Sequence, residues 1–396
     1  MLIDSLKLGR PLDGQVALIT GAGRGIGREA ALALSSLGAS IAIAELSETG
    51  RDTERAIRQR GSQAEFFQVD VSDPDAMTSL QQQLIGRFNR IDIVINNAVV
   101  FYVKPLTDYS VAEWDRLMAV NLRAAFLAAK LFVPPMVARG HGVFVTMQSG
   151  DGMPYLAPYF ASKVALRSLA SSLSQELGAN SGVSVFCFGA GMVDTPAIRE
   201  AVPRLAPLYG VSEDDFVKQS APGGVLMTAE ECGVGLAGCV LHAPELHGQE
   251  PAAVTGLALL GIGDGLWKRP DETAAPSPPV QAEDPAAAIE SLVAGLKSEI
   301  QGLGTFQRQW YRRTLKQRSG LALDEWEAVC HEIKDNPSEA ARYATDLKRL
   351  AGYFATLEKD ARGYIRDPHE LEQALAALEL RRAAAEQAAT SLAGSR

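Results

Sequence analysis

Residues 15–27 read Gln-Val-Ala-Leu-Ile-Thr-Gly-Ala-Gly-Arg-Gly-Ile-Gly. The first six residues predict a buried strand, and the glycines follow where a helix would begin. Glycines at this spacing allow a tight turn and let the backbone approach a pyrophosphate, which the N–H groups of the helix N-terminus would bind. The stretch therefore predicts a dinucleotide-binding turn. Its candidate binding residues are Gly21, Arg24, Gly25, Ile26 and Gly27.

Apolar strand-like runs alternate with helix-like segments from this turn to about residue 265. This alternation is typical of a parallel sheet that helices cover on both faces. It predicts an α/β, doubly wound parallel sheet of the Rossmann type over residues 1–265. The predicted strands are residues 15–20, 40–45, 65–69, 91–96, 142–147, 183–188 and 254–260, and the predicted helices are residues 24–37, 50–60, 75–88, 111–138 and 157–177.

The alternation stops between Thr195 and Thr228, in a stretch rich in proline and glycine with a short helix start at residues 212–215. An insertion after the sixth strand would lie at the carboxyl ends of the strands, where substrates of such sheets bind. We expect this stretch to form a lid over a substrate, and a surface loop without a role is the alternative.

The composition changes near residue 266. Residues 266–284 are rich in proline, alanine and acidic residues and predict a semi-extended linker. Residues 285–396 show helical periodicity without a strand-like run and predict a second, all-α domain for oligomerisation or docking, with a cap over the active site as the alternative. Its predicted helices are residues 285–303, 305–318, 324–334, 337–357 and 368–392, with Asn336 and Asp367 as N-caps.

Charge and composition exclude several classes of protein. The net charge of −9 argues against nucleic-acid binding. We expect no membrane span, because no apolar run reaches the roughly 18–20 residues that a bilayer requires. The N-terminus lacks the pattern of a secretory signal, and the four cysteines form no C-x-x-C pair, which predicts reduced thiols in the cytoplasm. The five histidines lack the spacing of metal ligands, so we predict no metal.

Tyr159 and Lys163 stand four residues apart in a predicted helix, and therefore on one helical face. An isolated tyrosine has a pKa near ~10, and an ammonium beside the phenol favours the phenolate. This pair can act as an acid and base near neutral pH. Together with the glycine turn, it predicts an oxidoreductase.

Glu45 closes the second predicted strand, where a carboxylate can accept hydrogen bonds from the adenosine ribose and repel a 2′-phosphate. It favours NAD over NADP. Arg24 argues for NADP, because a guanidinium pairs well with phosphate. Asp70 and Val71 follow the third strand and are candidates to flank the adenine.

Over about residues 10–265 the chain resembles the short-chain dehydrogenase/reductase family. The matching pieces occur in order: residues 20–27, Glu45, Asp70-Val71, Asn96-Asn97-Ala98, Asn121, Ser149, Tyr159-x-x-x-Lys163 and Gly191-x-x-x-Thr195. The resemblance implies a catalytic tetrad of Asn121, Ser149, Tyr159 and Lys163, in which Asn121 holds a water that links Lys163 to solvent. It also implies cofactor contacts from Asn97, Ala98, Gly191, Val193 and Thr195, and from Tyr159 and Lys163. Relatives pair their long helices as homodimers or homotetramers.

Three features depart from the family pattern. Val99 replaces a glycine after Asn97-Ala98, and Ala190-Gly191 replaces a Pro-Gly. The interval from Ser149 to Tyr159 is about three residues short, so Thr146 is the alternative hydroxyl. The residues expected around the substrate are mostly apolar and predict an apolar or ring-bearing secondary alcohol or ketone. They are Val99, Phe101, Tyr102, Met153, Tyr155 and Met192.

These features together predict an NAD-dependent dehydrogenase of secondary alcohols or ketones. An NADPH-dependent ketoreductase of a biosynthetic pathway is the alternative that Arg24 supports. A nucleotide-sensing scaffold, in which the fold survives without turnover, is the alternative from another class.

Overall fold

The computed structural model describes residues 2–262, except residues 151, 222 and 223, and parts of residues 289–394. These parts are residues 289–290, 292–297, 315–316, 321, 325–326, 328–329, 332, 342–364 and 368–394. The chain divides into two compact units, residues 1–268 and residues 269–396. The predicted linker, residues 266–284, lies outside the described residues.

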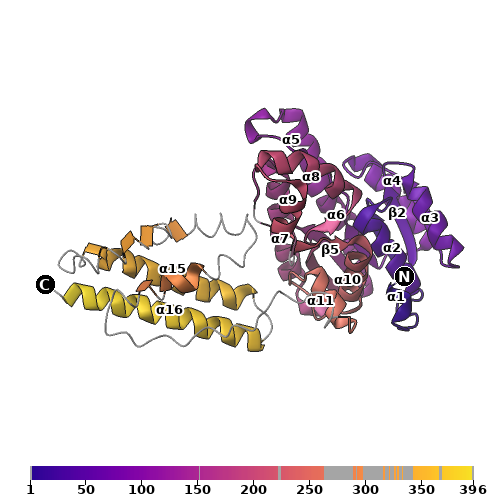
Figure 1. Cartoon of the computed structure of the whole chain (residues 1–396). Coiled ribbons are helices and arrows are strands. Elements are labelled where there is room, and N and C mark those ends of the chain that lie inside the picture. The colour runs from indigo at the N-terminus through magenta and orange to yellow at the C-terminus, as the bar shows by residue number, and fades with distance from the viewer. Residues whose placement is uncertain are drawn as a thin grey trace. The chain divides into compact units, whose positions relative to one another are not determined.

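The first unit contains a six-stranded parallel sheet with the order β3-β2-β1-β4-β5-β6. Figure 1 shows strands of this sheet among the surrounding helices. The strands are β1 Val16–Thr20, β2 Ser40–Glu45, β3 Ala64–Gln68, β4 Ile93–Asn96, β5 Gly142–Gln148 and β6 Val183–Gly189. Successive strands run outward from β1 in one direction and from β4 in the other. The carboxyl ends of β1 and β4 therefore flank the switch point where ligands of open α/β sheets bind.

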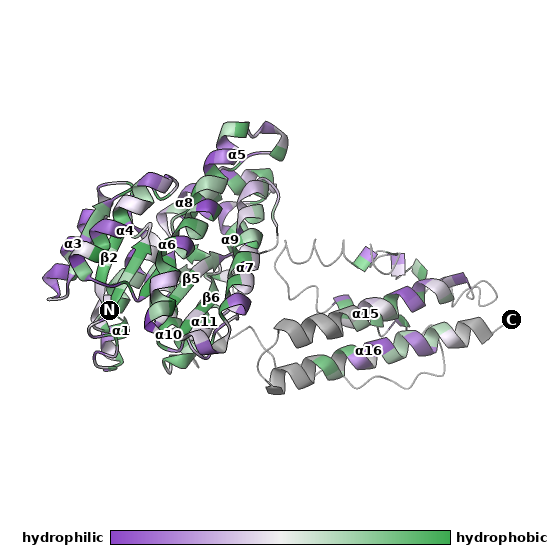
Figure 2. Cartoon of the chain, turned by 180° about the vertical axis from the view of Figure 1, so that it is seen from behind, coloured by the Kyte–Doolittle hydropathy of each residue, from purple (hydrophilic) through white to green (hydrophobic). Residues whose placement is uncertain are grey.

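Helices cover both faces of this sheet, which confirms the doubly wound fold. Along β1, Ala17 and Ile19 belong to a core with α2 Gly25–Ser36 and α10 Ala229–Leu241, whereas Leu18 faces the core on the other side. That second core contains α4 Pro74–Phe88, α6 Ala124–Arg139 and α7 Ala157–Leu177. The strands and α10 are mostly hydrophobic, whereas α3 Thr49–Gln59 is largely hydrophilic (Figure 2). The first unit also contains the short elements α1 Leu2–Ser5, η1 Leu106–Asp108 and η3 Ala179–Ser181.

The predicted seventh strand, residues 254–260, is wrong, because this run forms the helix α11 Ala253–Leu259. An apolar run of seven residues does not distinguish a strand from a buried helix. Here α11 packs closely on α10: a Cβ on Gly256 would lie 1.7 Å from the carbonyl oxygen of Gly235. The edge strand β6 instead hydrogen-bonds to residues 248–251, and an isolated parallel bridge joins Gly189 to Ala252.

The stretch from Thr195 to Thr228 is more regular than the sequence suggested. It folds into α8 Pro196–Leu208 and α9 Glu213–Ser220, between the short paired strands β7 Val193–Asp194 and β8 Met227–Thr228. Thr195 caps α8 by accepting from the Ile198 N–H at 3.3 Å, and a proline follows at the first helical position. Buried apolar residues of α8 and Phe216 of α9 stabilise both helices despite the prolines.

The long helix predicted over residues 111–138 consists of α5 Val111–Met118, a π-helical turn η2 Ala119–Arg123, and α6. By length and composition, the continuous stretch Val111–Arg139 could cross a membrane. This corrects the expectation that no stretch would be long and apolar enough. Half of its most apolar window is buried inside the protein, as in the core helices of soluble proteins.

In the second unit, α15 Ala344–Tyr364 packs against α16 Pro368–Gly394. Its core includes Trp326, Leu347, Phe354 and Ala385. The helical prediction holds for these two segments, although α15 extends seven residues beyond the predicted end. Asn336 and Asp367, predicted as caps, lie outside the described residues, as do most of the three earlier predicted helices.

Candidate active site

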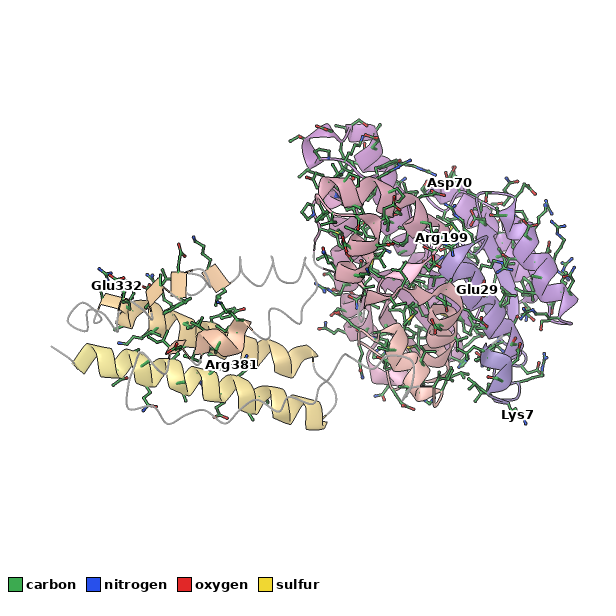
Figure 3. All side chains as sticks on the ribbon, viewed as in Figure 1. Lys7, Glu29, Asp70, Arg199, Glu332 and Arg381 are labelled. Atoms are coloured by element: carbon green, nitrogen blue, oxygen red, sulfur yellow. The ribbon has the colours of Figure 1, made fainter. Side chains whose placement is uncertain are left out.

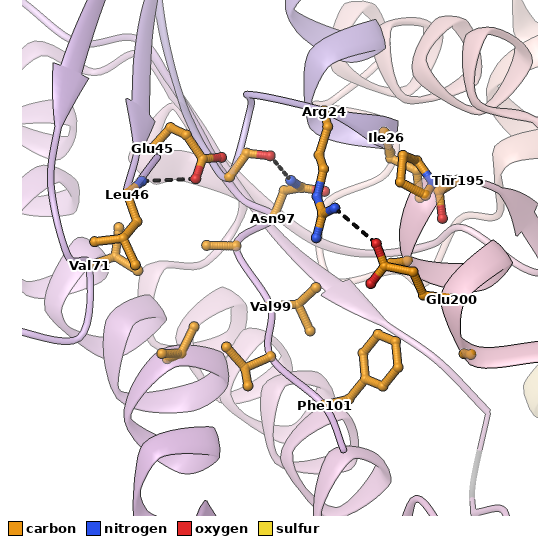
Figure 4. Close-up of a pocket in the computed structure, with 18 of the residues that line it drawn as sticks. Arg24, Ile26, Glu45, Leu46, Val71, Asn97, Val99, Phe101, Thr195 and Glu200 are labelled. Carbon is orange, nitrogen blue, oxygen red and sulfur yellow. Dashed lines mark hydrogen bonds and ion pairs between the residues drawn. The ribbon is translucent and has the colours of Figure 1, made fainter. Parts of the chain in front are cut away.

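A cavity of about 430 Å³ opens at the carboxyl ends of the strands (Figure 4). Ten of the predicted cofactor residues line it: Gly21, Arg24, Gly25, Ile26, Glu45, Asp70, Val71, Asn97, Ala98 and Thr195. The other five do not line it. Gly27 and Val193 are buried beside it, Gly191 forms a left-handed turn (φ +73°), and Tyr159 and Lys163 lie beyond it on α7.

The glycine turn is held against the end of β4. Asn97 Nδ2 donates to the carbonyl oxygens of Thr20 and Gly21, both at 3.0 Å, and Thr20 Oγ1 accepts from the N–H groups of Asn97 and Ala98. Gly21 (φ +67°) is left-handed, and a Cβ there would lie 2.8 Å from the Ala98 Cα. A Cβ on Gly27 would lie 2.4 Å from Asn97 Nδ2. Gly21 and Gly27 thus leave open a space beside the glycine turn, which we call the cradle, and side chains at these two positions would fill it.

The first turn of α2 offers N–H groups to the cavity. Arg24 is the N-cap of α2, and within the described part of the chain no side chain caps this helix. The uncapped N–H groups and the helix dipole make the position suited to an anion such as a pyrophosphate. The Arg24 guanidinium forms an ion pair with Glu200 of α8, at 3.5 Å from Nη1 to Oε1.

The Glu45 carboxylate folds back on the turn after its own strand. Oε2 accepts from the Gly23 N–H at 3.1 Å, and Oε1 accepts from the N–H groups of Leu46 (2.9 Å) and Ser47 (3.2 Å). These bonds hold the carboxylate at the cavity wall next to the glycine turn, where an adenosine ribose would lie.

The Asp70 carboxylate, labelled in Figure 3, is held by two neighbours. Arg116 Nη1 of α5 donates to Oδ2 at 2.8 Å, and Ser72 Oγ donates to Oδ1 at 2.7 Å. Partial burial alone would raise the pKa of Asp70, but the hydrogen bonds from Ser72 and the Arg116 charge outweigh it and lower the pKa. Asp70 is therefore an ionised acceptor at the wall of the cavity, beside the largely buried Val71.

Ser149, Tyr159 and Lys163 come together at the carboxyl end of β5 and the start of α7. The Lys163 Nζ lies 5.5 Å from the centroid of the Tyr159 ring, and the Ser149 side chain is near enough to the phenol to lower its pKa. Burial raises the pKa of Tyr159, and the Ser149 side chain only partly opposes this. The alternative hydroxyl, Thr146, is fully buried and donates to Cys187 Sγ at 3.1 Å.

Lys163 is buried and donates to the carbonyl oxygen of Met147 at 2.9 Å. Burial lowers its pKa to about 8, and the neighbouring Cys187 opposes this slightly. The ammonium form therefore still predominates at pH 7. Its charge can stabilise a phenolate at Tyr159, which a deprotonated lysine could not do.

Asn121 lies in the π-helical turn η2 and is buried. Its Oδ1 accepts from the Val100 N–H at 2.8 Å, and its Nδ2 donates to the Val100 carbonyl oxygen (2.9 Å) and to Ser162 Oγ (3.1 Å). The side-chain amide thus fixes the segment after β4 and connects it to α7. A π-helical turn inserted between α-helices is a frequent feature of functional sites.

The expected substrate-lining residues divide into three groups. Val99 and Phe101 line the cavity. Met153, Tyr155 and Met192 are half-buried and pack, together with Tyr159, against the apolar faces of α8 and α9. Tyr102 instead packs its ring on Tyr109, with 6.3 Å between the centroids.

Three charged residues that line the cavity were not anticipated: Arg116, Glu200 and Arg204. Glu200 and Arg204 are four residues apart on α8, a spacing that would have indicated a shared face had the helix been predicted. Arg116 carries no sequence signal of its own, because only the fold brings α5 to the end of β3.

A doubly wound sheet with a glycine turn and a Tyr–Lys pair at its carboxyl edge defines a Rossmann-type oxidoreductase. The model of the family described as short chain dehydrogenase matches residues 15–205. A 2-dehydro-3-deoxy-D-gluconate 5-dehydrogenase from Pseudoalteromonas atlantica is 35% identical over 210 residues, which are 50% of this chain and 81% of that protein. The chain belongs to the short-chain dehydrogenase family, and it is an enzyme of that family's oxidoreductase type.

Two further comparisons agree. A D-beta-hydroxybutyrate dehydrogenase from Rhizobium meliloti is 28% identical, and the match covers 64% of this chain and 98% of that protein. The crystal structure of an assigned NAD(P)-dependent gluconate 5-dehydrogenase from Beutenbergia cavernae, with bound NADP at low occupancy, is 28% identical. Its TM-score is 0.54, and the match covers 63% of this chain and 98% of that one.

Proposed function

We propose that the protein transfers a hydride between a nicotinamide cofactor and a secondary alcohol or ketone, with Tyr159 as the acid and base. The observation that carries this proposal is the grouping of Ser149 and Tyr159 with the buried Lys163 ammonium, whose Nζ lies 5.5 Å from the centroid of the Tyr159 ring. The three groups stand just after β5 and in the first turns of α7.

Each side chain has a separate task in this proposal. The bound nicotinamide supplies or accepts the hydride. Tyr159 exchanges a proton with the substrate oxygen, and Ser149 donates a hydrogen bond to that oxygen and stabilises developing charge. Burial raises the pKa of Tyr159, and in the proposal the positive charge of Lys163 favours the phenolate form of that side chain.

Asn121 acts as a positioning residue in this proposal. Its side-chain amide is hydrogen-bonded to Val100 and Ser162. We therefore propose that a water linking Lys163 to solvent is held by the backbone of the η2 turn rather than by the Asn121 side chain. The amide keeps the segment after β4 in place beside Tyr159.

NAD(H) is the proposed cofactor, and NADP(H) is the alternative. The uncapped α2 N-terminus and the cradle of Gly21 and Gly27 fit a pyrophosphate, and Glu45 is placed to accept from a ribose diol. The structure similar to this chain that contains NADP is one argument for the alternative. Arg24 is the other, and it would make the enzyme an NADPH-dependent ketoreductase.

The proposed substrate is an apolar or ring-bearing secondary alcohol or ketone. Phe101, Met153, Tyr155 and Met192 surround Tyr159 with apolar surface from two sides. The named relatives act on hydroxy and keto acids, so paired assays with cyclic alcohols and with short hydroxy acids distinguish the two substrate classes.

We also propose that the enzyme is a cytoplasmic homodimer or homotetramer. Val111, Trp114 and Phe126 on α5 and α6, and Val164 on α7, are exposed large apolar residues on the helices expected to pair. The free thiols of Cys187, Cys232 and Cys239 are buried, and burial raises the pKa of Cys187 to about 11. Such unpaired thiols are typical of a reducing compartment.

Calorimetric titration with NADH and with NADPH, followed by turnover assays, tests the proposal. Binding of one nucleotide and NAD(P)-dependent turnover of an alcohol or ketone would support it. If the Tyr159→Phe variant folds, binds nucleotide and turns over substrate as fast as wild type, the proposed role of Tyr159 is contradicted. Binding without any turnover would favour the nucleotide-sensing scaffold.

A further inference from the structure

An ion pair connects the two sides of the cofactor cavity. Arg24 belongs to the glycine turn and Glu200 to α8, and both line the cavity (Figure 4). The Nη1 and Oε1 atoms are 3.5 Å apart, and the side chains are 58% and 67% exposed. The pair can therefore exchange with solvent or with a ligand phosphate, because exposed pairs are weak.

The carboxylates of Glu45 and Glu200 both lie near Arg24 but have different hydrogen-bond partners. Glu45 accepts from the N–H groups of Gly23, Leu46 and Ser47, whereas Glu200 accepts from the Arg24 guanidinium. In Figure 4 Arg24 points toward Glu200, and Glu45 lies on the opposite side of the view. The guanidinium is thus directed away from the strand end where the adenosine ribose is proposed to lie.

The position of Glu200 on α8 is well fixed. Thr195 caps this helix, and Arg199, which is labelled in Figure 3, makes a two-point ion pair with Asp194 at 2.6 and 2.7 Å. Because the helix start is held, Glu200 presents its carboxylate to the cavity from a defined backbone.

We propose that Glu200 is a coenzyme-specificity residue that acts through Arg24. It holds the guanidinium toward α8, away from the strand end where a 2′-phosphate would lie, and so disfavours binding of that phosphate. The inference rests on the proposed nucleotide-dependent function. It assigns part of the selection between NAD and NADP to a residue of the segment that follows the sixth strand.

The test compares Glu200→Gln with wild type by calorimetric titration of the full chain with NADPH and with NADH. Since an exposed ion pair contributes little, the expected gain in NADPH affinity is roughly 3- to 10-fold, with NADH affinity changed by less than about 2-fold. Adding Arg24→Ala to Glu200→Gln should abolish the gain, because the effect acts through the guanidinium. The gain should also shrink in about 0.5 M salt.

Glu213→Gln is the matched control. Glu213 is an exposed acid at the start of α9, outside the cavity lining, and its substitution removes the same charge. An equal NADPH gain in Glu213→Gln would overturn the inference in favour of net charge. So would an equal gain for both nucleotides in Glu200→Gln, which would mean easier access to the cavity. If folded wild type binds neither nucleotide, the proposed function itself fails, and the inference fails with it.

Discussion

The ring of Phe101 packs edge-on against the ring of Tyr159, with 5.8 Å between the centroids and 67° between the planes. Phe101 also lines the cavity, which the Tyr159 side chain does not reach. Phe101 therefore contacts both the cavity and the proposed acid and base, and we expect it to touch a substrate bound between them.

Replacing Phe101 with alanine should widen the site on the substrate side. We expect turnover of bulky cyclic alcohols to rise relative to that of small ones, and KM for small alcohols to increase about 10-fold, since a large apolar contact is lost. Steady-state kinetics with a graded series of alcohols measures this. Phe101→Leu is the conservative control and should shift the preference less. An unchanged preference in Phe101→Ala would place the substrate elsewhere.

Tyr159→Phe should lower kcat by about 10²-fold or more, because general acid–base catalysis contributes that much, while the nucleotide Kd stays within about 2-fold. Tyr209→Phe is the control: Tyr209 packs on Tyr155 in the same apolar cluster, and its substitution should leave kcat nearly unchanged. Stopped-flow hydride transfer and nucleotide titration separate the two effects. Equal losses in both variants would indicate disturbed packing instead.

Lys163 should make stability depend on pH. Burial lowers its pKa from 10.5 to about 8, so the unfolded chain binds more protons between pH 8 and 10.5, and this contribution to stability rises with pH. From pH 7 to pH 9 the gain is about 1 kcal/mol. Urea unfolding measures the free energy of unfolding of wild type and of Lys163→Met at pH 7 and at pH 9. The contribution of Lys163 is the pH-dependent change in wild type minus the same change in the variant. Parallel pH dependence of the two proteins would contradict the buried-ammonium interpretation.

Gly27→Ala should disturb the glycine turn and its contact with Asn97. The new Cβ would lie 2.4 Å from Asn97 Nδ2 and 2.6 Å from the Gly21 carbonyl oxygen, so we expect a loss of about 1–3 kcal/mol and weaker nucleotide binding. Gly86→Ala, in the exposed interior of α4 with no atom within 4 Å, should instead stabilise by about 0.5–1 kcal/mol. Urea unfolding and calorimetry of the pair test both signs.

The first six strands could be predicted from apolar runs because each run is bounded by a turn signal, as at Gly21 after β1. The α11 helix could not, since its apolar run acquires helical form only by packing against glycines of α10. In the site, Tyr159 and Lys163 are neighbours on one helix and can be found by spacing. The pairs Asp70–Arg116 and Arg24–Glu200 join segments 46 and 176 residues apart, and only the fold brings them together.

The segment that follows α10 has a consequence for solubility. Gly248 donates to Val185, while Cys187 and Gly189 donate to the carbonyl oxygens of Gln249 and Pro251, so the outer side of β6 is paired by irregular chain instead of a seventh strand. An open strand edge is a template on which another molecule can add its own strand. Here that edge is occupied by residues 248–252, and Pro251 within this segment has no N–H group that a further strand could use. The fold thereby limits edge-to-edge aggregation at the β6 edge of the sheet.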